Sequence, residues 1–295
     1  MSIWFSTDKS SAPTVLPPVA GIDRIVLTSP RLPFRVAQGI TIEGFRNLPG
    51  YRTGVAVPTK RNSSHKMMVR LHPRRTGDPY VELYYGPAKP SAPACQIVVH
   101  APPGGYADDL TRPLSLVGAL EKRLRWRFVI TELEIALDFE GDCLALRYLQ
   151  RQFYVPRTTR HFVHGSMYWG TGRSARQWRS YQNLTFGTPR ARFEIVVRSS
   201  ALRALALRHF PDLVRKTFLG YVERSFQLLD ARLPQRANAT AVMAFLHSVH
   251  AVGTTIAILA VPARKRTRLR GYLQQSSADK LARNALADLR RRLKP

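Results

Sequence analysis

The sequence predicts an α+β protein with an antiparallel-rich sheet and flanking helices, followed by a mostly helical C-terminal part. Short runs rich in β-branched and aromatic residues recur up to residue 200. Beyond residue 200, apolar residues recur at helical spacing. A length of 295 residues suits one large domain or two smaller ones. We therefore expect a flexible arm over 1–20, an α+β domain over 21–200 and a basic helical region over 201–295.

The first half of the chain contains most of the predicted strands. Pro113 opens an amphipathic stretch that predicts a helix over 113–124. The alternating pattern of 127–140 predicts a long strand, and the acidic start of 142–153 predicts a helix after it. Further runs bounded by Gly, Pro and Asn predict strands over 22–27, 66–71, 81–85, 96–100, 165–170, 177–181 and 190–198.

The pattern of the second half predicts helices over 201–209, 211–229, 240–260 and 279–293. A domain boundary near residue 200 is one interpretation, and helices that pack back on the same sheet are the other. Residues 241–261 carry no formal charge and are long enough to span a bilayer, so a membrane anchor is an alternative. His247, Ser248 and other polar residues near the middle of this run favour a buried helix, and we expect no membrane partner.

The charge of the chain indicates a polyanionic partner. Lys and Arg number 46 against 19 acids, which gives a formal charge of +27 and a pI near 11.2. Nucleic acid is the first candidate for such a partner. One dense basic run, predicted to contact duplex DNA or else to remain solvated, contains Arg264, Lys265, Arg266, Arg268 and Arg270. Two cysteines without a zinc motif favour a reducing, cytoplasmic compartment.

The strand over 127–140 carries an unusual cluster of acids for so basic a chain. Because side chains alternate along a strand, Ile130, Glu132, Glu134, Ala136, Asp138 and Glu140 are expected on one face. Thr131, Leu133, Ile135, Leu137 and Phe139 are then expected on the core face. Neighbouring carboxylates repel, so a cation must compensate them. Oxygen ligands without cysteine point to Mg²⁺ or Mn²⁺, and the alternative is a solvated edge face or carboxylates paired with the abundant arginines.

A second strand, 190–198, places Glu194 on one face with Arg192 and Arg198. Glu194 is interpreted either as a metal ligand from a neighbouring strand or as a partner in a structural ion pair. Arg192 and Arg198 would then hold a phosphate backbone.

Between these two strands, aromatic residues alternate with arginines, including Arg173, Arg176 and Trp178. Rings that stack on bases and guanidinium groups that bind phosphates are typical of single-strand binding. Tyr181 shares a strand face with Arg179 and Gln177. Its phenol is a candidate nucleophile if a cation or metal lies nearby, and stacking or packing is the alternative.

Taken together, residues 128–205 resemble the Rep_trans-type replication initiators, the rolling-circle proteins of small plasmids and phages, which are related to relaxases. The acidic strand ELEIALD (132–138) is similar to the family pattern R-[IL]-D-[IL]-A-[VI]-D. YWGTGRS (168–174) is similar to its Y-x-G-S-R-x-S turn, and Arg179-Ser180-Tyr181 to its R-x-Y motif. RFEIVVR (192–198) is similar to its R-F-E-[IL]-x-[IL]-R strand, and the order of all four motifs agrees.

The resemblance implies a relaxase-like fold and a metal-dependent nickase. Tyr181 would attack origin DNA, become linked to the 5′ phosphate and release a 3′ hydroxyl that primes synthesis. Glu134, Asp138 and Glu194, with Glu132 nearby, would hold Mg²⁺ or Mn²⁺. The partners implied are single- and double-stranded origin DNA, a host helicase and a second copy of the chain, in the cytoplasm of a bacterial host.

The sequence departs from the family pattern at four positions. Glu134 stands in place of Asp, Glu132 in place of Arg, and Gln182-Asn183 in place of an acid followed by Lys. His161 and His164 are spaced one residue too widely for the paired-histidine strand motif of other rolling-circle nucleases, so they are interpreted as surface or DNA-facing residues. The alternative function is a catalytically silent DNA-binding protein, an origin binder or repressor, on the same scaffold.

Overall fold

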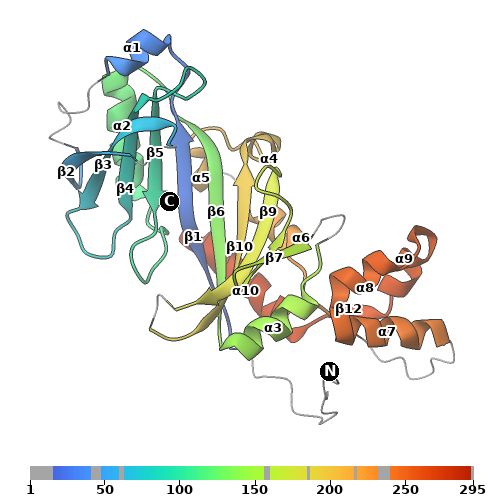
Figure 1. The fold of residues 1–295 in the computed structure, drawn as a ribbon. Coiled ribbons are helices and arrows are strands. Elements are labelled where there is room, and N and C mark those ends of the chain that lie inside the picture. Colours follow the sequence, from blue (N-terminus) through green and yellow to red (C-terminus); the bar gives the residue numbers. More distant parts are fainter. Residues whose placement is uncertain are drawn as a thin grey trace.

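The structure is a computed structural model that describes residues 16–40, 48–59, 63–155, 160–184, 187–215, 218–231 and 240–293. Its central feature is a ten-stranded sheet in the order β2-β3-β4-β5-β1-β6-β10-β9-β8-β7, with every neighbouring pair antiparallel (Figure 1). Helices and this sheet together confirm the predicted α+β class with an antiparallel sheet. The N-terminal arm lies mostly outside the described residues.

The sheet contains all the predicted strands and two that the sequence did not predict. The unpredicted strands are β2 and β7 at its two edges, where alternation of buried and exposed residues is weak. The strands are β1 (Val19–Thr28), β2 (Tyr51–Pro58), β3 (His65–Pro73), β4 (Tyr80–Pro87), β5 (Cys95–His100), β6 (Val129–Glu140), β7 (Arg160–Val163), β8 (Ser166–Trp169), β9 (Arg176–Asn183) and β10 (Arg190–Arg198).

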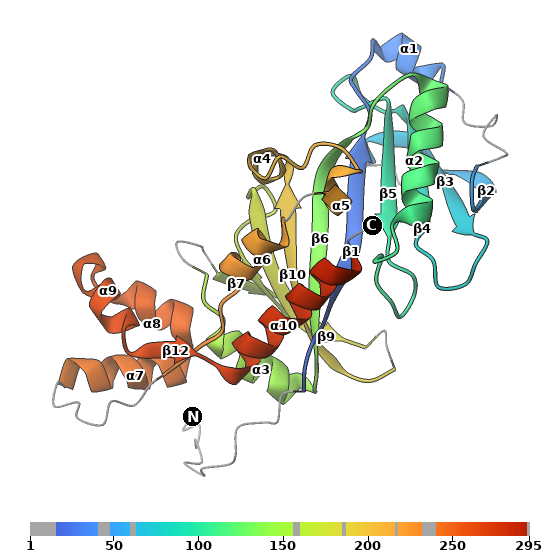
Figure 2. The ribbon, with the colours of Figure 1, turned by 180° about the vertical axis from the view of Figure 1, so that it is seen from behind.

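Helices cover one face of the sheet and leave the other to polar residues. Figure 2 shows α2 and α10 in front of the strands on the covered face. Leu133, Ile135 and Leu137 of β6 face these helices and pack with Leu120 of α2 and Leu286 of α10 in one buried cluster. The helices around this core are α1 (Phe34–Gln38), α2 (Thr111–Leu124), α3 (Cys143–Gln152), α4 (Ser199–Ala204), α5 (Asp212–Arg215), α6 (Leu219–Ser225) and α10 (Ser277–Arg292).

The predicted position of Ile130 on the acidic face is wrong. The pairing of β1 with β6 shifts between Val26, which faces Glu132, and Leu27, which faces Ile130, so Thr131 is an extra residue in β6. Such a bulge interrupts the alternation of side chains. Ile130 therefore joins the buried core at 1% exposure, while the carboxylates beyond the bulge keep the face that alternation predicts.

The C-terminal part of the chain divides between two hydrophobic clusters. α7 (Thr240–Val252), α8 (Thr254–Ala260) and α9 (Ala263–Arg270) pack with the small sheet of β11 (Leu229–Ala231) and β12 (Leu273–Gln275). α10 instead returns to the large sheet and buries Leu286 and Leu289 in its core. The core of residues 21–200 thus also contains the last helix.

Two predicted helices are interrupted. Gly253, with φ +88°, separates α7 from α8, and a Cβ there would lie 3.0 Å from the Arg151 carbonyl oxygen. The predicted helix 211–229 is replaced by the short α5 and α6, separated by residues outside the described part, and by the start of β11. Among the described helices, none is long and apolar enough to cross a bilayer.

Candidate active site

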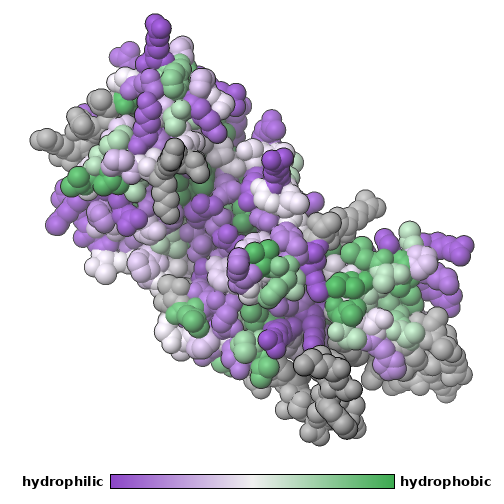
Figure 3. Space-filling model, in the orientation of Figure 1, coloured by the Kyte–Doolittle hydropathy of each residue, from purple (hydrophilic) through white to green (hydrophobic). Residues whose placement is uncertain are grey.

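The polar face of the sheet gathers the acids and the tyrosine that the sequence singled out. Residues directly opposite each other on antiparallel strands share a face. Arg192 of β10 lies opposite both Asp138 of β6 and Tyr181 of β9, and Glu194 lies opposite Arg179. Figure 3, in the orientation of Figure 1, shows hydrophilic residues over the central strands of this face.

Arginines bridge the carboxylates of this face into one network. Glu134 accepts hydrogen bonds from Arg24 Nη2 at 2.7 Å and from Arg179 Nη2 at 3.0 Å. Arg179 Nε also donates to Glu194, so this one guanidinium joins acids from two strands. Because Glu134 and Glu194 are almost fully buried, these charges depend on one another for neutralisation.

The network extends from this centre to both ends of the strands. Arg192 binds Asp138 in a bidentate pair, with Nε to Oδ1 at 2.7 Å and Nη2 to Oδ2 at 2.6 Å. Arg192 Nη1 also reaches Asp23 at 3.0 Å. At the other end, Arg198 Nε donates to Glu132 Oε2 at 2.9 Å. Arg192 and Arg198, predicted to hold DNA, therefore neutralise carboxylates of the sheet.

Tyr181 lies half-buried inside this network. Its hydroxyl donates a hydrogen bond to Glu194 Oε1 at 2.5 Å. Burial, together with the neighbouring Glu194 carboxylate, raises the pKa of Tyr181 well above its ordinary value. The phenol is therefore protonated at neutral pH, and Glu194 is the group placed to accept its proton.

A second phenol, Tyr106, closes the site from the loop before α2. Its hydroxyl donates to Asp138, and its ring lies directly over Gly21 of β1. A Cβ on Gly21 would lie 2.1 Å from Tyr106 Cγ, so only glycine leaves room for this ring. Burial first, and then the Asp138 carboxylate, raise the pKa of Tyr106.

A pocket of about 340 Å³ opens next to Arg192. Its walls come from β1, β4, β5, β9 and β10 and from the loop 101–105, and they include Asp23, Tyr80, His100 and Asn183. The His100 ring stacks on Tyr80 with centroids 4.6 Å apart. Burial raises the pKa of Asp23, and the nearby Glu194 carboxylate raises it further.

Sequence reasoning missed Asp23, Arg24, Tyr106 and His100. Strands containing Asp23, Arg24 and His100 were predicted, but the pairing of β1 with β6 that brings Arg24 to Glu134 joins residues 110 positions apart. The one signal available was Gly21 at the start of a strand, since a glycine there indicates close approach of another group.

The site in this arrangement does not fit a divalent cation. Both oxygens of Glu134 and of Asp138 accept hydrogen bonds from arginine, and both oxygens of Glu194 accept from Arg179, Arg192 or Tyr181. A metal ion requires ligand oxygens that are free to coordinate it. Within the described residues, no group of three or more His, Cys, Asp or Glu could hold one. In this arrangement guanidinium groups supply the compensating charge, which is the arginine-pairing alternative, and binding of Mg²⁺ or Mn²⁺ stays a prediction.

The remaining predicted DNA-binding residues lie away from Tyr181. Arg173 is exposed in the turn after β8, whereas Arg176 and Trp178 point to the helix side of the sheet. Arg264, Lys265, Arg266, Arg268 and Arg270 lie on α9, at the far end of the molecule from β2 (Figure 1). His161 is the exception, because it lies opposite Tyr168, which lies opposite Arg179, and so shares the polar face of the site. Its ring stacks on that of Tyr168 with centroids 5.2 Å apart, and His164 follows in the turn between β7 and β8.

Comparison of the chain with protein-family models gives no match, and no curated protein is significantly similar to it.

Proposed function

We propose that this protein is a replication initiator that nicks origin DNA through Tyr181 and so starts rolling-circle replication of a plasmid or phage. The observation that carries the proposal is the hydrogen bond from the Tyr181 hydroxyl to Glu194 on the arginine-rich face of the sheet. A nucleophile next to a group that accepts its proton is the usual arrangement for covalent catalysis. The order of the family-like motifs, and the antiparallel sheet that contains three of them as strands, support the same proposal.

In the proposed reaction, the Tyr181 oxygen forms a bond to phosphorus and Glu194 takes the phenolic proton. The bond from phosphorus to the 3′ oxygen breaks, its electron pair stays on that oxygen, and a proton from water completes the 3′ hydroxyl, leaving hydroxide that takes up the proton held by Glu194. Arg179, whose side chain is 30% exposed, contacts the nonbridging oxygens of the phosphate. Because the described carboxylates are engaged by arginines, no step here passes through a metal ion.

The test is cleavage of supercoiled or single-stranded origin DNA by purified protein. We expect a nicked product with protein covalently attached to its 5′ end, and loss of both with Tyr181→Phe while DNA binding remains. Tyr84→Phe is the matched control, because that phenol also donates to a carboxylate, Glu82 Oε2 at 2.7 Å, but in the other half of the sheet. Cleavage by Tyr181→Phe at the wild-type rate would disprove the role of Tyr181.

A second candidate function is a catalytically silent origin-binding protein or repressor. One observation favours it: in the described network, every oxygen of Glu134, Asp138 and Glu194 already has a donor. Such a network stabilises the fold without any chemistry. Binding of authentic origin DNA without cleavage, with and without added Mg²⁺ or Mn²⁺, would establish this function instead.

A further inference from the structure

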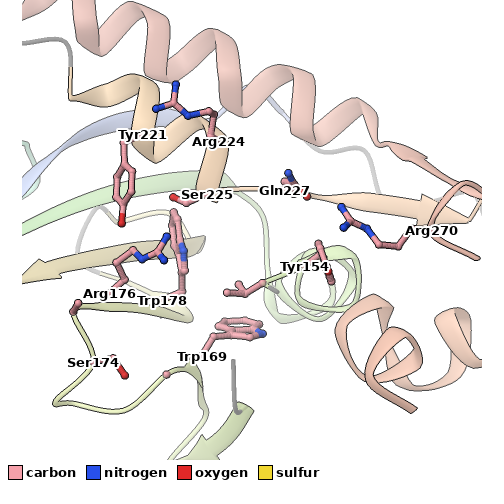
Figure 4. A pocket seen from close by; sticks show the side chains of 13 residues that line it. Tyr154, Trp169, Ser174, Arg176, Trp178, Tyr221, Arg224, Ser225, Gln227 and Arg270 are labelled. Atoms are coloured by element: carbon pink, nitrogen blue, oxygen red, sulfur yellow. The ribbon is translucent and has the colours of Figure 1, made fainter. Parts of the chain in front are cut away.

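A pocket of about 610 Å³ lies on the helix side of the sheet, on the opposite face from Tyr181 (Figure 4). Trp178 of β9 lines it, and because Trp178 and Arg179 are adjacent in one strand, their side chains point to opposite faces. α6, the segment 225–227, Tyr154 and the end of α9 form the other walls. A volume of this size is typical of sites for small organic ligands.

Three arginines from separate elements reach this pocket: Arg176 of β9, Arg224 of α6 and Arg270 of α9. Arg176 lies over the Tyr221 ring at 5.3 Å, and Arg270 lies over the Tyr154 ring at 4.9 Å. No carboxylate lines the pocket, and none of the three arginines forms an ion pair within the described part of the chain. Unpaired guanidinium groups lining one pocket favour an anion, and phosphate above all.

The same pocket has an aromatic wall and an unused donor. Trp169, Trp178 and Tyr154 lie around the lower part of the cavity in Figure 4. Trp169 is 1% exposed, and its indole N–H has no hydrogen-bond partner among the residues that the structure describes. A buried donor without a partner is costly, so a ligand or a water that accepts from it would be stabilising.

We propose that this pocket binds a nucleotide, either free or as a unit of a single strand. The base lies against the aromatic wall, and arginines of the pocket bind the phosphate. A bare anion would leave the rings unused, and an apolar ligand would leave the three guanidinium groups without an anionic partner. The inference does not depend on the proposed nicking, because Tyr181 lies on the other face.

The test uses thymidine 5′-monophosphate, thymidine, inorganic phosphate and a short oligothymidylate, with binding measured by calorimetry. We expect saturable binding of the monophosphate and binding at least about tenfold weaker for thymidine and for phosphate alone. Arg270→Gln should weaken monophosphate binding by about tenfold, whereas Arg268→Gln, an exposed arginine on the same helix, should not. Trp169→Phe should also weaken it, and Tyr181→Phe should leave it unchanged.

Competition identifies the source of the nucleotide. Displacement of the oligothymidylate by the monophosphate would assign the pocket to a strand, and monophosphate binding without competition would assign it to a free nucleotide. The proposal is wrong if neither ligand binds saturably, if inorganic phosphate binds as tightly as the monophosphate, or if Arg268→Gln and Arg270→Gln have equal effects. If the wild-type protein does not nick origin DNA but still binds the nucleotide, the proposed function is wrong and the nucleotide site is unaffected.

Discussion

Tyr181 and Glu194 come from neighbouring antiparallel strands, and the phenol of one donates a hydrogen bond of 2.5 Å to the carboxylate of the other. Burial and this carboxylate raise the pKa of Tyr181, so the phenol does not ionise by itself at neutral pH. Glu194 accepts the hydrogen bond of the protonated Tyr181 phenol, and the same carboxylate is the base that would remove this proton. The pair either reacts or only stabilises the sheet, so Glu194 must be tested for a catalytic role as well as Tyr181.

Glu194→Gln separates these two roles. We expect the substitution to abolish cleavage, since an amide does not accept the phenolic proton, while single-strand binding persists. Removing the carboxylate also removes a charge that disfavours phenolate, so the pKa of Tyr181 should fall toward its ordinary value. An absorbance titration of this variant against Tyr181→Phe measures that shift. Faster cleavage by Glu194→Gln would show that Glu194 restrains the tyrosine and is not its base.

Binding of Mn²⁺ tests the competition between arginines and metal. Arg179→Gln frees one oxygen each of Glu134 and Glu194, so we expect Mn²⁺ to bind this variant about tenfold more tightly than wild type. Arg198→Gln is the control, because Arg198 contacts Glu132 but neither Glu134 nor Glu194. Electron paramagnetic resonance titration counts bound Mn²⁺ without any cleavage assay. Tight binding by wild type would mean that the ion displaces these guanidinium groups unaided.

Much of the candidate site follows from strand alternation. Glu134 and Asp138 share a face because the residues between them alternate regularly, and Glu194 and Tyr181 each follow the same rule in their own strands. The sequence therefore predicts which side chains share a face within each strand, and the pairing of β6, β10 and β9 brings these faces together. Where the alternation breaks, at the bulge beside Thr131, the prediction for Ile130 fails.

Partners from distant segments were beyond sequence reasoning. Arg24 reaches the acids, and Asp23 reaches Arg192, only because β1 lies between β5 and β6, and no local pattern specifies that neighbour. A second bulge between Ile22 and Arg24 turns Asp23 toward Arg192. For the same reason, the sequence does not decide whether a metal ion or arginines neutralise the carboxylates. Composition shows that arginines are abundant, but not which carboxylates they contact.

Glu82 provides a pH-dependent prediction in the other half of the sheet. Burial acts to raise its pKa, but hydrogen bonds from Arg70, Tyr84 and His100 outweigh burial and lower the pKa below the ordinary 4.5. A lowered pKa means that the folded state favours the carboxylate, so Glu82 stabilises the fold above pH 4.5 and loses that effect as pH falls through its folded pKa.

We expect Glu82→Gln to lower the free energy of unfolding by about 2 kcal/mol at neutral pH, and the difference from wild type to shrink in acid. Urea denaturation of both proteins across this pH range measures it. Glu140→Gln, an exposed acid at the end of β6, should change little at any pH. A difference that grows as pH falls would show that the carboxylate is not the stabilising form.

The arginines of α9 are the natural test of duplex binding, but truncation of the C-terminus is a poor experiment. Removing residues beyond 262 would also remove α10, whose Leu286 and Leu289 are fully buried in the main core. Arg266 is also unsuitable, because its guanidinium hydrogen-bonds the carbonyl oxygens of Val261 and Leu259 and so holds the start of the helix. Arg264, Lys265 and Arg268 are exposed and can be replaced without disturbing packing.

Replacing these three with Gln should weaken duplex binding and flatten its salt dependence. For each DNA phosphate that the variant no longer neutralises, the slope of log affinity against log salt concentration falls by about 0.9, so three phosphates correspond to a change of about 2.7. The matched control replaces Arg31, Arg74 and Arg75, which are equally exposed and lie in the N-terminal half of the sheet or beside it. Equal changes in the two triple variants would mean that the whole charge of +27 acts diffusely. A slope that changes only in the α9 variant would place the duplex on this helix. A slope that is unchanged in the α9 variant but flattened in the control variant would place duplex recognition on the N-terminal strands.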